Sequence, residues 1–179
     1  MTARPSEELI MSIVTPLQSG RLEEALGAAR TVEAAYPDFP ITQNLIGIIL
    51  QVMGQLEDAL EPFQRAVAQR PDYVEAQNNL GVLLHRMDRH TEAATHFLAA
   101  IDQRPDYAEA LNNLALLMRD MKREADAMVL LSRAIDVSPG YTQALINKAD
   151  LLEKLGRMDE AALCRQRARL AGPAAKFSP

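Results

Sequence analysis

The sequence predicts an all-α protein made of five copies of one helix pair. The main observation is a repeat, because PDYVEAQNNLG at residues 71–81 returns as PDYAEALNNLA at residues 105–115, which is 34 positions later. The second observation is composition: 48% of the residues are hydrophobic, only 4% are aromatic and tryptophan is absent. A core of Ala, Leu, Ile, Val and Met suits helix packing better than sheet packing.

The 34-residue period runs along nearly the whole chain. It links prolines (Pro37, Pro71, Pro105, Pro139, Pro173), alanines (Ala25, Ala59, Ala93, Ala127, Ala161) and acids (Glu24, Asp58, Glu92, Asp126, Glu160). A period of this length indicates stacked supersecondary units. We therefore expect a single array over residues 1–179, with repeats at about 3–36, 37–70, 71–104, 105–138 and 139–172 and a flexible tail at 173–179.

Each repeat is expected to hold two helices joined by a short turn. In the third repeat, residues 74–86 and 91–103 carry apolar side chains at helical spacing. Gly20, Gly54 and Gly156 fall in the turn inside three repeats, where glycine adopts a positive φ at little cost. The predicted breaks between helices lie near residues 19–21, 36–40, 54–56, 70–73, 87–90, 104–107, 121–123, 138–141 and 155–157.

The first and last repeats depart from the pattern. Pro16 lies inside the first predicted helix, which should therefore be kinked or short because proline lacks a backbone N–H. Lys148 and Arg165 stand at places that are apolar in the third repeat. We expect residues 158–170 to form a C-terminal cap, since a terminal repeat needs a polar outer face.

This pattern resembles the tetratricopeptide repeat family, which has 34-residue helix pairs, three small residues per repeat and a proline near the repeat end. Gly81, Ala93, Ala100 and Pro105 take those places in the third repeat, and the resemblance covers about residues 3–173. It implies a right-handed superhelical solenoid of five helix-turn-helix repeats, with the first helices lining a concave groove. It also implies a non-catalytic protein-interaction module rather than an enzyme.

Asparagines recur in the groove phase that the family implies. Asn79, Asn113 and Asn147 share one place in the repeat, and a primary amide can both donate to and accept from a peptide backbone. The arrangement resembles the asparagine ladder of the superhelical arrays in O-GlcNAc transferases. The alternative is that these amides bond a neighbouring helix or water. The predicted groove residues are Asn44, Asn78, Asn79, Asn112, Asn113, Asn147, Leu45, Ile48, Val82, Arg86, Leu116 and Arg119.

Several function classes are disfavoured by the sequence. A net charge of −5 argues against a nucleic-acid partner. The longest apolar stretch, Leu45–Leu50, is too short to span a membrane, and Glu7 and Glu8 stand where a signal peptide would be apolar. A single cysteine, Cys164, fits a reducing compartment. We expect a cytoplasmic protein with no membrane or nucleic-acid partner.

No residue pattern indicates chemistry. His85, His90 and His96 are not spaced for metal binding, Cys164 has no neighbouring base, and no phosphate-binding glycine loop is present, so we expect no metal and no cofactor. The function expected is binding a peptide segment or helix of a partner protein in the groove. Two alternatives stay open: a self-assembling homo-oligomer formed through the apolar N-terminal end, or a targeting subunit of an enzyme complex such as a protein glycosyltransferase.

Overall fold

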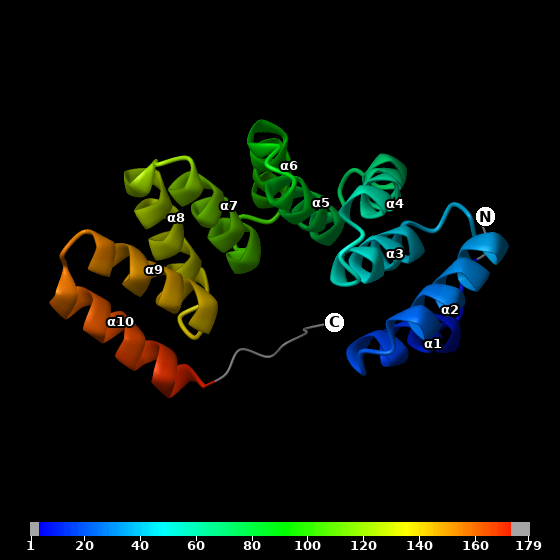
Figure 1. The fold of residues 1–179 in the computed structure, drawn as a ribbon, viewed down its shortest axis with the longest axis horizontal. Coiled ribbons are helices and arrows are strands. Elements are labelled where there is room, and N and C mark those ends of the chain that lie inside the picture. The colour runs from blue at the N-terminus through cyan, green and yellow to red at the C-terminus, as the bar shows by residue number, and fades with distance from the viewer. Residues whose placement is uncertain (1–3, 173–179) are drawn as a thin grey trace. The chain divides into compact units, whose positions relative to one another are not determined.

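The fold is all-helical, as predicted. The computed structural model describes residues 4–172 and has ten α-helices and no strand within them (Figure 1). The helices are α1 (Glu7–Gln18), α2 (Leu22–Ala35), α3 (Pro40–Val52), α4 (Leu56–Gln69), α5 (Val74–Arg86), α6 (His90–Gln103), α7 (Ala108–Asp120), α8 (Glu124–Val137), α9 (Thr142–Lys154) and α10 (Met158–Ala171). Every break between them falls within one residue of its predicted place. The five helix pairs predicted from the period are therefore confirmed.

Two compact units make up the chain, Met1–His96 and Phe97–Pro179, with the boundary inside α6. In the first unit α1 packs on α2 and α3 packs on α4, while α2 and α4 also pack on the first helix of the next repeat. In the second unit α8 packs on both α7 and α9, and α10 packs on α9. A second helix inside the array is thus shared between two repeats.

Small residues allow the helices of a pair to approach closely. Ala25, Ala59, Ala93 and Ala127 share one place in the repeat and are fully buried. Gly47 on α3 has the most demanding contact, because a Cβ atom added there would lie 2.7 Å from ring carbons of Phe63 on α4. The period in small residues is therefore a packing requirement.

The turn inside each repeat uses a left-handed residue. Gly20, Gly54 and Gly156 have φ values of 73°, 83° and 76°. Asp88 and Lys122 stand at the same place in the other two repeats and have φ values of 57° and 63°. The turn geometry is therefore common to all five repeats, although only three of them carry the residue that adopts it without strain.

Arginine–carboxylate pairs mark the start of most second helices. Arg21, Arg123 and Arg157 occupy N-cap positions, although an arginine side chain has only donors and cannot cap a backbone N–H. The pairs, each between residues three apart, are Arg21–Glu24, Arg89–Glu92, Arg123–Asp126 and Arg157–Glu160, at 2.6–2.8 Å. The periodic acids therefore lie in the first helical turn, where a negative charge is also favoured by the helix dipole.

The first repeat is less disturbed than its sequence predicts. Pro16 lies inside α1 and is buried, yet the helix continues to Gln18. Its 12 residues compare with 13 in α3. The expected shortening amounts to a single residue, because Pro16 comes in the last turn, where few backbone bonds remain to be lost.

The last helix is only partly the polar cap that the sequence predicts. Arg165 on α10 donates to Asp150 and Glu153 on α9 at 2.9 and 2.8 Å. However, α10 also exposes Met158, Leu163 and Leu170, the last of them to 81%. The predicted tail at 173–179 lies outside the described residues.

Candidate functional site

The predicted groove amides are mostly buried. Asn44, Asn78, Asn112 and Asn147 are each at most 6% exposed, whereas Asn79 and Asn113 are half-buried. Buried amides need hydrogen-bond partners, so the arrangement of these six side chains decides what they can contact. The structure shows partners on neighbouring first helices in both units.

In the first unit the amides connect α3 to α5. Asn79 donates from Nδ2 to Oδ1 of Asn44 at 3.0 Å, and Asn44 donates from its own Nδ2 to the Tyr73 hydroxyl at 3.4 Å. Both ends of the Asn44 amide are therefore used inside the protein. Burial is the largest influence on the Tyr73 hydroxyl and raises its pKa.

In the second unit the corresponding amides connect α7 to α9. Asn147 donates to Oδ1 of Asn112 at 2.7 Å, and Gln143 donates to Oδ1 of Asn147 at 3.1 Å. Asn112 in turn donates to Oδ1 of Asn113 at 3.5 Å. The same type of bond thus occurs in both units, from an asparagine of one repeat to the asparagine one place earlier in the preceding repeat.

Sequence reasoning did not predict this pairing, although the sequence holds the signal for it. We call Asn44, Asn78 and Asn112 the acceptor row, after the role of Asn44 and Asn112, and Asn79, Asn113 and Asn147 the donor row, after the role of Asn79 and Asn147. The donor row begins and ends one repeat later than the acceptor row. Leu45 takes the donor place in the second repeat, and Ile146 takes the acceptor place in the fifth. That offset of 35 residues is the separation of both observed bonds.

The predicted apolar contact residues form a partly open row. Ile48, Val82 and Leu116 stand 34 residues apart and are half-buried, as is Leu45. Helix α3, which carries Leu45 and Ile48, has no charged residue in its sequence PITQNLIGIILQV. Val52 at its end is 57% exposed. This face of α3 is therefore apolar and incompletely covered.

The two predicted arginines have local partners. Arg86 on α5 is exposed and donates to the backbone oxygen of Gln51, near the C-terminus of α3, at 3.3 Å. Arg119 on α7 pairs with Asp120 at 3.3 Å. Surface ion pairs of this kind are weak, so a ligand carboxylate can compete for Arg119.

An aromatic row precedes the first helices, and sequence reasoning missed it. Tyr73, Tyr107 and Tyr141 are the N-cap residues of α5, α7 and α9, and Phe39 takes the same place before α3. Arg70 lies over the Tyr73 ring at 3.8 Å. Burial, with a smaller contribution from Glu109, raises the pKa of Tyr141 to about 12.

The histidines have structural partners. Nδ1 of His96 lies 2.7 Å from Oε1 of Gln77, and burial lowers the pKa of His96. The rings of His85 and His90 meet edge to face, with centroids 5.7 Å apart. Within residues 4–172 no group of three His, Cys, Asp or Glu side chains is placed to hold a metal ion. In the same range, no helix is long and apolar enough to cross a membrane.

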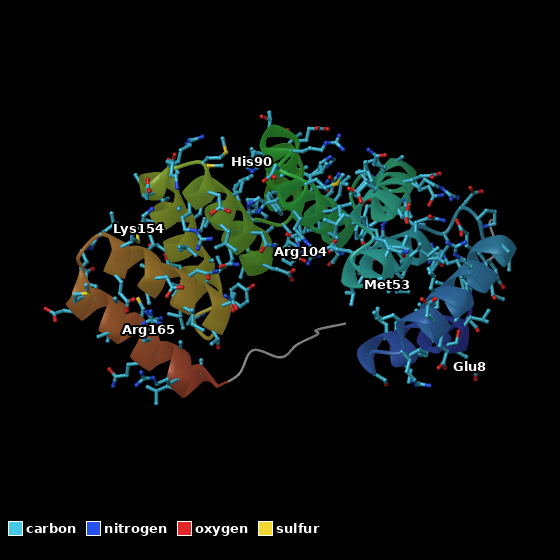
Figure 2. The ribbon with its side chains drawn as sticks, in the orientation of Figure 1. Glu8, Met53, His90, Arg104, Lys154 and Arg165 are labelled. Atoms are coloured by element: carbon cyan, nitrogen blue, oxygen red, sulfur yellow. The ribbon has the colours of Figure 1, made fainter. Side chains whose placement is uncertain are left out.

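Some charged side chains of the second unit bond between helices. Figure 2 shows Lys154 on α9 and Arg165 on α10, and Lys154 reaches Glu124 on α8 at 2.9 Å. Lys148 donates to the Ser132 hydroxyl of α8 at 2.9 Å. The basic residues that replace apolar ones in the last repeat thus bond within the second unit.

Comparison with known proteins gives a consistent family. The tetratricopeptide repeat profile matches residues 44–108, 86–136 and 125–175. The pilF protein of Pseudomonas aeruginosa has a similar fold, with a TM-score of 0.85 and 22% identity over 94% of this chain and 77% of that one. No curated protein sequence matches the chain significantly.

Solved structures of MamA proteins are also similar. One has a TM-score of 0.73 and 24% identity over 88% of this chain and 92% of that chain. Another, MamA 41-end from Desulfovibrio magneticus RS-1, has a TM-score of 0.77 and 17% identity over 99% of this chain and 100% of that chain. At these identities the likeness shows a shared fold.

Proposed function

Since the chain belongs to the tetratricopeptide repeat family, we propose that it holds a segment of a partner protein against its first helices. Arrays of this repeat are protein-interaction scaffolds and are typically non-catalytic. The observation that carries the proposal is the partly open apolar row, which consists of Leu45, Ile48 and Val82 in the first unit and of Leu116 in the second. Exposed apolar surface that is incompletely covered often marks a contact site.

Energetics favour the apolar row over the amides as the source of affinity. Association costs at least about 4 kcal/mol in lost rigid-body freedom. A hydrogen bond contributes only about 1 kcal/mol net, and Asn44, Asn112 and Asn147 already bond to side chains of the protein. Covering a large apolar side chain contributes about 1.5–3 kcal/mol when burial is complete. Several half-buried side chains together therefore outweigh the remaining amide bonds.

The half-buried amides would add a smaller contribution to binding. Asn79 and Asn113 are half-buried, and an amide has two N–H donors and one acceptor. The bond from Asn79 to Asn44 uses one of those donors. We propose that Asn79 and Asn113 contact the ligand backbone while Leu45, Ile48, Val82 and Leu116 select its side chains. A cytoplasmic location stays a prediction from the sequence.

The test is a peptide-display selection against the full chain, followed by affinity measurements on the selected peptides. Leu45→Asp and Ile48→Asp should weaken some peptides strongly and others little, because they change side-chain contacts. Asn79→Ala should weaken all peptides by a similar factor, because every ligand has the same backbone. Val129→Asp is the matched control, since Val129 is an exposed apolar residue on a second helix. Equal effects of Leu45→Asp and Val129→Asp would contradict the proposal.

A further inference from the structure

Contacts between repeats follow one pattern, which the first unit shows most clearly. Ala66 on α4 forms a buried cluster with Tyr73 and Ala76 of the next repeat, and Val67 packs against it. The second helix of one repeat therefore packs on the first helix of the next. The second helix contributes the places of Ala66 and Val67, and the first helix contributes the place of Ala76.

Helix α1 exposes the surface that later first helices bury in this way. Thr42, Ala76, Ala110 and Ala144 share one place in the repeat, and each is fully buried. Glu8 takes that place on α1 and is exposed (Figure 2). The next residue, Leu9, is 37% exposed, whereas Leu111 and Leu145 at its place are fully buried. Part of α1 thus has the position of an interface without being covered.

Helix α10 carries the complementary place, where Arg169 is exposed while Ala168 is only 6% exposed. Ala168 stands where Ala66 and Ala134 stand, and Arg169 stands where Ile101 and Ile135 are buried. A hollow of about 420 Å³ lies between α9 and α10, lined by Thr142, Ile146, Arg165, Ala168, Arg169 and Gly172. In the same unit, the corresponding side of α8 is occupied by α9.

We propose that α10 of one copy packs against α1 of a second copy in the register used between repeats. That register places Arg169 beside Glu8, and within residues 4–172 neither side chain forms an ion pair. It also covers Leu9. Inside the second unit Lys148 donates to Ser132. In the proposed contact Ser12 of the second copy takes the place of Lys148, and Gln166 of the first copy takes the place of Ser132, and these polar side chains are compatible.

Charge decides that the two faces pair with each other and not with themselves. The first turn of α1 carries Glu7 and Glu8, while the face of α10 that enters this contact carries the exposed Arg169. Two α1 faces or two α10 faces would bring like charges together, which disfavours association. Contact between unlike faces leaves one of each open, so assembly continues beyond a dimer unless a ring closes.

Sedimentation velocity of the full chain over a wide concentration range tests this assembly. The wild type should show a mass that rises with concentration past the dimer and that falls at high salt, because the pair is screened. Glu8→Arg and Arg169→Glu should each weaken association by at least about tenfold. The double variant Glu8→Arg/Arg169→Glu should restore it, since the pair is only exchanged.

The matched controls are Glu23→Arg on α2 and Arg167→Glu on α10, which make the same charge changes at exposed sites away from the proposed pair. Both should associate like the wild type. A wild type that stays monomeric at every concentration, or a double variant no better than the single ones, would overturn the proposal. Peptide binding by the monomeric variants separates this result from the fate of the proposed function.

Discussion

Asn112 and Asn147 are two buried side chains that join α7 to α9 through a hydrogen bond. Asn112 is 1% exposed and accepts from Asn147 at 2.7 Å. In Asn147→Ala the Asn112 oxygen loses this donor in a place that water reaches poorly, so we expect a loss of about 1–3 kcal/mol in the free energy of unfolding. Urea denaturation measures it.

Asn79→Ala is the comparison for that loss. Asn79 makes the corresponding bond to Asn44 but is half-buried. Water has better access to this place, so Asn79→Ala should lower the free energy of unfolding less than Asn147→Ala does. Equal losses for Asn147→Ala and Asn79→Ala would mean that burial does not decide the strength of these bonds.

Tyr141 gives the protein a pH dependence at the alkaline end. The pKa of Tyr141 rises from 10.0 to about 12, chiefly because the side chain is buried. Between those values the folded protein retains a proton that the unfolded chain has lost, so rising pH favours unfolding. The contribution of Tyr141 to stability is complete below about pH 10 and is lost as the pH approaches 12.

Tyr141→Phe should therefore flatten the fall in unfolding free energy between pH 10 and 12. Denaturation of both proteins at pH 7 supplies the control, because it measures the cost of losing the hydroxyl without its titration. If the two proteins lose stability in parallel above pH 10, Tyr141 is not the group responsible.

At the scale of the helix pair, two glycines inside helices should respond oppositely to the same substitution. In Gly47→Ala on α3 the new Cβ atom meets the buried Phe63 ring at 2.7 Å, and overpacking of this kind costs about 1–3 kcal/mol. In Gly27→Ala on α2 nothing lies within 4 Å. Alanine there should stabilise the helix by about 0.5–1 kcal/mol.

Thermal or urea unfolding shows whether each variant is more or less stable than the wild type. Because the substitution is identical, helix propensity contributes equally to each variant and the difference reports the contact with Phe63. A stabilised Gly47→Ala protein would show that α3 and α4 can separate at little cost.

The helix pairs were predictable because the period records packing. Ala93, Ala127 and the prolines recur where two backbones approach or a helix ends, and these constraints act on a residue type directly. The turn residues were predictable only in part. Asp88 and Lys122 take a positive φ because the geometry of the repeat imposes it, whereas their own preference is for negative φ.

The site was less predictable than the helices. The groove phase identified Asn79 and Asn113, which are half-buried, but also Asn147, which is not. Whether an amide faces solvent or the next helix depends on the rotation of two helices about their axes, and the spacing of one sequence does not fix it. The tyrosine row was missed because the site residues were predicted from the groove phase, and these N-cap residues lie just before the first helices.

At the scale of the whole chain, stability should be local. In each unit the helix contacts join only elements of the same or the next repeat, and in such arrays a perturbation acts mainly on its neighbours. Gly47→Ala should therefore speed amide hydrogen exchange in α3 and α4 and leave α9 and α10 close to the wild type. Exchange followed by mass spectrometry resolves the helices, and uniform acceleration would indicate a single cooperative unit.

The offset amide rows also constrain how the gene can gain or lose copies of the repeat. The third and fourth repeats each carry one donor asparagine and one acceptor. Removing residues 71–104 as a block would move Asn113 into the place of Asn79, opposite the place of Asn44. Removing the last repeat would instead strip Asn112 of its donor. We therefore expect loss of a middle copy to preserve these amide bonds and loss of the last copy to remove one of them.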